Sequence, residues 1–100
     1  MKIIWLPRAL RRINEIADFI AEDNPDAAHL WVLDIFGAVE RLENFPRSGR
    51  IVPETNKDDI REVVHGKYRI IYRVRSKTVA VLTVRHSRQL LPLAELKSRK

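Results

Sequence analysis

The residues best suited to chemistry lie between Arg61 and Arg88. His86 stands beside Arg85, at the end of an apolar run, and an imidazole there can act as a general base or acid. Clustered arginines such as Arg69 and Arg88 can bind phosphate through paired N–H groups. This group is therefore suited to a phosphate-binding site. The alternative is a histidine that hydrogen-bonds a backbone carbonyl and holds the last strand in place.

A second set of arginines could form a binding surface. Arg69 and Arg73 have the same strand parity, and Ile71 between them makes that side only partly polar, which favours a binding surface over a solvated face. Glu54 and Glu62 could form salt bridges with these arginines, which is the simpler interpretation of both carboxylates. The candidate binding residues on this sheet are Arg61, Arg73 and Arg85.

Standard catalytic and metal-binding motifs are missing from the sequence. It has no glycine-rich phosphate loop, nucleophile elbow or HExxH motif, and no cysteine. The three histidines, His29, His65 and His86, do not have the spacing of metal ligands. We therefore expect neither a metal site nor a cofactor.

Positive charge is concentrated in the second half of the chain. The net charge is +6, yet residues 1–50 hold seven basic and eight acidic residues, whereas residues 51–100 hold twelve and five. A basic surface of this kind attracts polyanions or an acidic protein partner, although it can also serve solubility alone. The lack of cysteine and of a signal-like or membrane-spanning run is consistent with a cytoplasmic protein.

Hydrophobic periodicity predicts the elements that position these residues. We expect helices over residues 8–22 and 26–45, joined by a short turn in which Asn24 caps the second helix. Alternating and β-branched runs predict strands over residues 3–6, 61–65, 68–75 and 79–86. Residues 50–60 are polar and predict a loop or a loose extended segment.

These elements predict an α+β fold in the order β-α-α-β-β-β. An antiparallel two-helix hairpin would pack on a mostly antiparallel four-stranded sheet. We expect one domain over residues 1–92 and a C-terminal tail over 93–100. The sequence leaves three alternatives for this tail: a short helix, a frayed end, or a segment that a partner orders. Leu30 and Leu33 fall outside the core pattern of the second helix and are candidate partner contacts.

A series of short segments recurs in a recognisable order along the chain. The segments are Trp5 with Pro7, IADFIAEDNP (16–25), Ala27-Ala28, LENFPRSGR (42–50), Val52-Pro53-Glu54, Arg61-Glu62, YRIIY (68–72) and the strand end from Val84 to Arg88. In this order they resemble the RelE/ParE superfamily, the toxins of bacterial type II toxin–antitoxin pairs. The resemblance covers nearly the whole chain, to about residue 92.

The resemblance implies a small basic toxin that a cognate antitoxin neutralises in a toxin–antitoxin complex. In the ParE-like branch such a toxin inhibits DNA gyrase. In the RelE-like branch it enters the ribosome and cleaves mRNA. The long helical hairpin and the GR-x-VPE segment are more similar to the ParE-like branch.

The RelE-like catalytic pattern is matched only in part. Arg69 and Arg88 fall where that branch places phosphate-binding arginines, but Ile60 and Glu62 fall near the positions of its paired lysines. No tyrosine follows Arg88. Some relatives use a glutamate, an arginine and a histidine, roles that the resemblance would give to Glu54, Arg69 and His86.

Three hypotheses follow. The first is a ParE-like gyrase inhibitor without cleavage chemistry. The second is a RelE-like, ribosome-dependent endoribonuclease, in which His86, Arg69 and Arg88 would be catalytic. The third is a basic binding module that is not a toxin.

Overall fold

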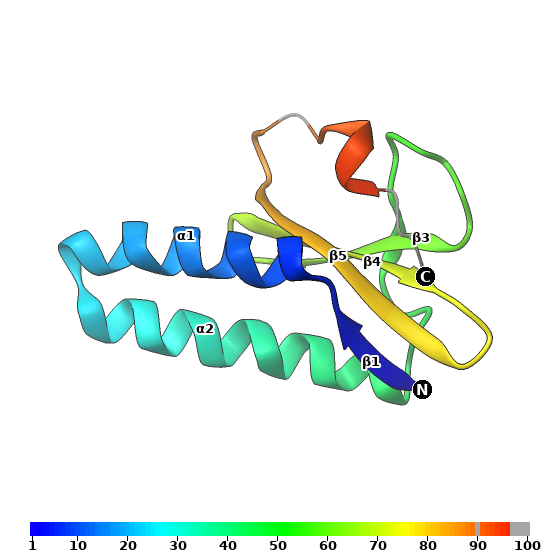
Figure 1. Ribbon diagram of the computed structural model, residues 1–100, viewed down its shortest axis with the longest axis horizontal. Helices are drawn as coiled ribbons and strands as arrows, with labels where there is room; N and C mark the ends of the chain where they lie inside the picture. Colours follow the sequence, from blue (N-terminus) through cyan, green and yellow to red (C-terminus); the bar gives the residue numbers. More distant parts are fainter. Residues whose placement is uncertain (90, 97–100) are drawn as a thin grey trace.

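A helical hairpin and a twisted sheet form the two main layers of the molecule (Figure 1). The computed structural model describes residues 1–89 and 91–96. The strands are β1 (Lys2–Trp5), β2 (Arg50–Ile51), β3 (Ile60–His65), β4 (Tyr68–Val74) and β5 (Thr78–His86), the α-helices are α1 (Pro7–Asp23) and α2 (Pro25–Glu40), and the 3₁₀ helices are η1 (Arg41–Glu43) and η2 (Leu93–Leu96).

The ends of the helices follow from residues that can be read in the sequence. Pro7 and Pro25 occupy the first positions of α1 and α2, where a missing N–H costs no hydrogen bond. The Asn24 side chain accepts a hydrogen bond of 3.0 Å from the Ala27 N–H, so the predicted N-cap is confirmed. The α-helical part of α2 ends at Glu40, earlier than predicted, and the chain continues through η1 toward Pro46.

The sheet has the strand order β1-β5-β4-β3-β2. β1 pairs with β5 in parallel, and the other neighbours are antiparallel, so the mostly antiparallel α+β fold is confirmed. The four predicted strands are joined by a fifth, because Arg50 and Ile51 pair with Glu62 and Arg61 of β3. Part of the expected loop at 50–60 thus belongs to the sheet edge.

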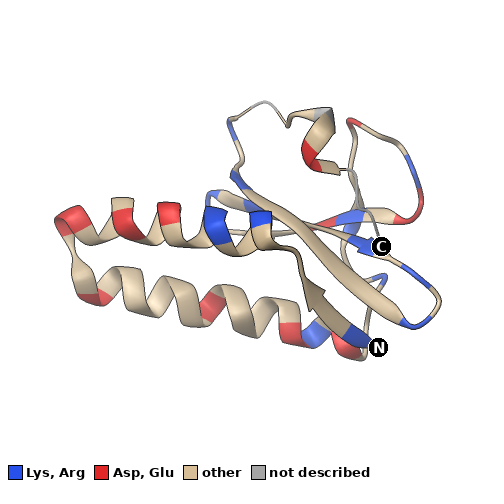
Figure 2. Cartoon of the chain, in the orientation of Figure 1, with Lys and Arg blue, Asp and Glu red and all other residues tan. Residues whose placement is uncertain are grey.

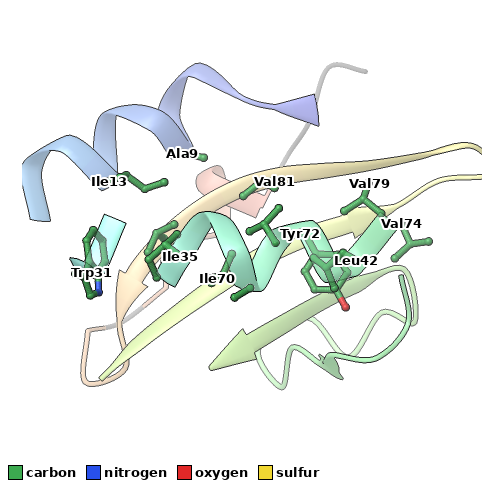
Figure 3. Packing of buried hydrophobic residues seen from close by; sticks show 13 residues of the cluster. Ala9, Ile13, Trp31, Ile35, Leu42, Ile70, Tyr72, Val74, Val79 and Val81 are labelled. Atoms are coloured by element: carbon green, nitrogen blue, oxygen red, sulfur yellow. The ribbon is translucent and has the colours of Figure 1, made fainter. Parts of the chain in front are cut away.

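The main hydrophobic core lies between the helical hairpin and one face of the sheet (Figure 3). Ala9 and Ile13 of α1 and Trp31 and Ile35 of α2 pack against strand residues such as Tyr72. The helices reach beyond the sheet at the turn that joins them (Figure 1). Their apolar side chains near this turn are therefore less covered than those above the sheet.

A second hydrophobic cluster lies on the opposite face of the sheet. It contains Val52, Ile60, Ile71, Ala80, Leu82, Leu91 and Leu96. The loop after β2 and the segment 91–96 therefore cover this face. Positions 93–96 of the predicted tail form η2, in which Leu96 is buried. Position 90 and the end of the tail, 97–100, lie outside the described residues.

A β-bulge in β5 changes which face its last residues occupy. Tyr72 pairs with Val81 but Ile71 pairs with Thr83, so Leu82 is an extra residue opposite β4. Leu82 belongs to the second cluster and Val84 to the main core. Beyond the bulge, His86 therefore lies on the helix side of the sheet, and Arg85 lies on the other side.

Gly49 marks a close approach between the segment before β2 and the core. Its N–H donates a hydrogen bond of 3.0 Å to the hydroxyl of the buried Tyr72. A Cβ at position 49 would lie 2.5 Å from the Glu62 carbonyl oxygen and 2.6 Å from the Tyr72 hydroxyl. Only glycine fits at this position without displacing its neighbours.

We predict that Gly49→Ala lowers the free energy of unfolding by about 1–3 kcal/mol or more, because the added methyl overpacks a buried site. Gly37→Ala is the matched control, since a Cβ at Gly37 in α2 would meet nothing within 4 Å. Alanine there should raise stability by up to about 1 kcal/mol, because it favours the helix. Urea denaturation of both variants measures the difference, and equal effects would contradict the packing at Gly49.

Candidate functional site

Arg69 of β4 is enclosed by carboxylates. Its Nε donates to Glu62 Oε1 at 2.5 Å, and its two terminal nitrogens donate to the two oxygens of Glu54 at 2.7 and 2.8 Å. Arg69 and Glu62 are both buried. The second oxygen of Glu62 accepts from Arg50 Nε at 2.5 Å. The interpretation of Glu54 and Glu62 as salt-bridge partners is thus confirmed.

Hydrogen bonds in this network favour the charged forms of Arg69 and Glu54. The bidentate hydrogen bond from Arg69 lowers the pKa of Glu54, although partial burial opposes the shift. The same hydrogen bonds raise the pKa of Arg69, against the effect of its own burial. All three nitrogens of the guanidinium face protein carboxylates, so binding of an external phosphate would require one of them to give way.

A second network ties η2 to the sheet and to α1. The buried Glu95 accepts hydrogen bonds from Arg12 at 2.9 Å, from Arg85 at 3.3 Å and from the Thr83 hydroxyl at 2.7 Å. Burial alone would raise the pKa of Glu95. The hydrogen bonds from Arg12 and Thr83 and the charge of Arg85 outweigh it, and the pKa is lowered. Glu95 is thus a charged anchor for the C-terminal segment.

Arg61 and Arg73 also bind to the protein itself. Arg61 donates to Asp58 at 2.8 Å and to the Gly49 carbonyl at 2.9 Å. Arg73 lies 3.5 Å from Asp59 and donates to the Leu96 carbonyl at 3.3 Å. The positive charge of the sheet arginines is therefore largely balanced by acidic groups of the protein itself.

Charge is unevenly distributed over the molecule. Lys and Arg lie along the sheet, its turns and the start of α1, whereas acidic residues gather toward the far end of the hairpin (Figure 2).

His86 lies on the other side of the sheet from Arg69. Tyr68, its partner across the strands, packs edge-on against it with ring centroids 5.4 Å apart. Tyr68 also packs against Trp31 of α2 at 5.2 Å, so the histidine faces the helices. His86 Nδ1 accepts the Arg88 N–H at 3.1 Å, which leaves Nε2 for another contact. The Arg88 backbone thus contacts His86, whereas the Arg69 side chain lies on the opposite face of the sheet from His86.

The two leucines singled out on α2 are exposed. Leu30 has 60% and Leu33 has 53% of its surface in contact with solvent. Leu30 lies in the second turn of α2, close to the turn that joins the helices, and Leu33 lies near the middle of α2. Phe19 of α1, at 70%, is a third exposed side chain at this end, which the sequence analysis missed. Its position outside the apolar stripe of α1 was the available signal.

Glu95 was also missed, because the C-terminal segment had too little pattern to be assigned. The apolar residues Leu91 and Leu96 on either side of Glu95 were the signal that this segment packs on the sheet, and the structure buries both of them. Within residues 1–89 and 91–96, no three His, Cys, Asp or Glu side chains are grouped so that they could hold a metal ion. None of the helices described is long and apolar enough to cross a membrane.

Comparison with known sequences gives a consistent set of relatives. Residues 3–91 match the family model described as the ParE toxin of the type II toxin–antitoxin system parDE. A putative toxin, Y4kP, of Sinorhizobium fredii is 44% identical over 93 residues, covering 91% of this chain and 93% of that protein. Toxin RelE2 of Caulobacter vibrioides is 32% identical over 90 residues, covering 89% and 98%.

Two solved structures share the fold. The chromosomal ParDE system from P. aeruginosa contains a chain that matches with a TM-score of 0.70 and 21% identity, covering 86% of this chain and 95% of that one. The RelBE2 toxin–antitoxin complex of Mycobacterium tuberculosis matches with a TM-score of 0.55 and 22% identity, covering 85% and 95%.

We predict that Glu62→Gln lowers the free energy of unfolding by about 1–3 kcal/mol, because the buried carboxylate that accepts from both Arg69 and Arg50 is lost and Glu54 alone is left to neutralise Arg69. Asp58→Asn is the matched control. Asp58 also pairs with two arginines, Arg47 and Arg61, but 69% of its side chain is exposed. Its loss should cost less than about 1 kcal/mol. Denaturation at pH 7 compares the two variants, and similar losses would contradict the burial of the network.

Proposed function

Because the chain belongs to the ParE toxin family of type II toxin–antitoxin systems, we propose that it arrests growth by inhibiting DNA gyrase. A cognate antitoxin protein would neutralise it in a hetero-oligomeric complex. Gyrase acts in the cytoplasm, so the proposal implies a cytoplasmic toxin. The enclosure of Arg69 by Glu54 and Glu62 is the observation that carries the choice of target.

A nuclease site would need its phosphate ligands and its proton-transfer group on the same surface. Arg69 donates to two internal carboxylates, and His86 lies on the opposite face of the sheet. Charge stabilisation of a scissile phosphate requires donors that are free to face it. Ile60 and Glu62, where the RelE-like branch has lysines, are buried. These features support a toxin that acts by binding.

The second candidate function is ribosome-dependent cleavage of mRNA. The similarity to the protein named Toxin RelE2 favours it, as do His86 and Arg88, which lie together at the end of β5. In that case His86 Nε2 would move protons and Arg88 would bind the phosphate. Arg69 would have to leave its carboxylates to take part.

The antitoxin is proposed to cover the exposed apolar residues of the hairpin. Leu30 and Leu33 expose apolar surface that a partner could bury, and the solved relatives include toxin–antitoxin assemblies. The arginines Arg61, Arg73 and Arg85 are proposed to contribute at the rim of a partner interface, where each keeps its internal carboxylate.

We predict that the purified protein inhibits DNA supercoiling by gyrase, and that expression in cells stops DNA synthesis while translation continues. The measurements are a supercoiling assay and pulse labelling of DNA and protein early after induction. His86→Ala should leave inhibition within about twofold of the unchanged protein, because a binding toxin needs no general base. Rapid loss of translation with codon-positioned cuts in mRNA, abolished by His86→Ala, would instead establish the ribonuclease function.

We predict that replacing Leu30 and Leu33 together by Glu weakens antitoxin binding by at least about thirtyfold, because two buried aliphatic contacts would become buried charges. Calorimetric titration with the antitoxin measures the change. Phe45→Glu is the control, since Phe45 is 66% exposed but follows η1 at the other end of α2. Unchanged affinity of the double variant would place the antitoxin elsewhere.

A further inference from the structure

An exposed apolar stripe lies along the outer face of α2. Leu30, Leu33 and Phe36 follow one another at intervals of three residues, so their side chains point to one side of the helix. They are 60%, 53% and 39% exposed. At a rise of 1.5 Å per residue the stripe is about 9 Å long. Its complement is therefore an elongated protein segment.

The stripe ends at a small pocket beside the edge strand β1. The ring centroids of Phe36 and Trp5 lie 4.7 Å apart, and both rings line the pocket together with Ile3 and Val39. The pocket volume of about 210 Å³ lies below the range of about 300–1,000 Å³ that is typical of small-molecule sites. The pocket therefore has room for a single inserted side chain.

Two carboxylates form the polar wall of this pocket. Glu40 and Glu43 are both exposed, and neither forms an ion pair with any residue that the structure describes. Glu40 stands four residues after Phe36 and therefore on the same side of α2. The Met1 ammonium donates to the Glu43 backbone carbonyl at 3.1 Å, which leaves the Glu43 carboxylate for another cation. Carboxylates beside two aromatic rings are complementary to a cation on an apolar stem.

The helical hairpin carries charge of the opposite sign to the rest of the chain. Residues 13–40 contain seven Asp and Glu and no Lys or Arg, although the net charge of the chain is +6. These acidic residues are distributed over both helices (Figure 2). An acidic partner segment, which the total charge would favour, is repelled by this surface. Charge complementarity therefore favours a basic segment at the stripe.

From these features we infer that a basic amphipathic segment of the antitoxin lies along the stripe and inserts one arginine side chain into the pocket. Its aliphatic part packs on the rings of Trp5 and Phe36, and its guanidinium binds Glu40 and Glu43. Arginine fits better than lysine, because a planar guanidinium stacks on a ring and can donate to two carboxylates. The inference rests on the proposed neutralisation by an antitoxin and adds the chemistry of the segment that binds.

The first measurement tests the pocket without the antitoxin. The probes are N-acetylarginine amide and N-acetylcitrulline amide, which have nearly the same shape but differ in charge. Two-dimensional NMR of the ¹⁵N-labelled full chain follows the two indole N–H signals, and Trp5→Phe identifies that of Trp5. The arginine probe should shift the Trp5 signal and leave that of the buried Trp31 unchanged. The citrulline probe should bind at least about tenfold more weakly, because hydrogen bonds to a neutral group are weaker.

The second measurement is calorimetric titration of variants of the full chain with the antitoxin, expressed from the open reading frame adjacent to the toxin gene. Glu40→Gln combined with Glu43→Gln should weaken binding at least about tenfold, because the inserted guanidinium loses both of its anions. Phe36→Leu keeps an apolar contact but removes a ring face, so it should weaken binding between about twofold and thirtyfold.

Asp18→Asn combined with Glu22→Gln is the matched control. It removes the same amount of charge from two exposed positions of α1 that do not line the pocket. Antitoxin affinity should change less than about twofold, because exposed charges contribute little. Unchanged circular dichroism of each variant separates a loss of binding from misfolding.

Three results would overturn the inference. Equal binding of the two probes, or no shift of the Trp5 signal, would show that the pocket does not recognise a guanidinium. Full antitoxin affinity of the variant without Glu40 and Glu43 would place the antitoxin's basic side chain elsewhere and leave the proposed neutralisation intact. Equal losses in this variant and in the control would reduce the effect to the general negative charge of the hairpin. An unchanged chain that does not bind the antitoxin at all would contradict the proposed neutralisation itself, and the inference with it.

Discussion

Three arginines of β4 and β5 point toward one face of the sheet, and that face can be covered only if carboxylates neutralise them. Glu62 and Glu54 form salt bridges with Arg69. Asp59 forms one with Arg73, and Glu95 forms one with Arg85. A buried charge without a partner would cost several kcal/mol. The two short segments that carry most of these acids, the loop after β2 and η2, are also those that bury the second hydrophobic cluster. Charge pairing and apolar packing therefore fix the same segments in place.

This constraint explains how a strongly basic chain can have a sheet whose charge is mostly internal. The arginines that could contact an external polyanion instead bind the loop after β2 and η2, the two segments that cover this face of the sheet. We propose that partners bind at the exposed leucines of α2 and at the end of β5, where His86 and Arg88 lie. A toxin that acts by binding a protein target, and that an antitoxin can mask, is consistent with this distribution.

Much of the fold could be predicted from local sequence. The prolines at 7 and 25, the Asn24 cap and the apolar periodicity fixed the helical hairpin, and the order of motifs indicated the RelE/ParE superfamily, which the comparisons confirm. The bulge at Leu82 was not predictable, because nothing in a run of β-branched residues marks one extra residue. Yet this residue alone decides that His86 and Arg69 occupy opposite faces. The role of Glu95 depends on contacts with distant segments of the chain, and its partner Arg12 is more than eighty residues away in the sequence. No local sequence pattern reveals such a contact.

We propose that Arg69 supports the fold and is not a phosphate ligand. The most direct measurement is growth inhibition by the double variant Arg69→Met, Glu62→Leu, which removes both buried charges together. Apolar replacement of a whole buried ion pair is often neutral for stability, and Glu54 and Arg50 are partly exposed and can be solvated. We expect the double variant to fold cooperatively and to arrest growth as the unchanged chain does. A double variant that folds with undiminished stability but no longer arrests growth would contradict the account.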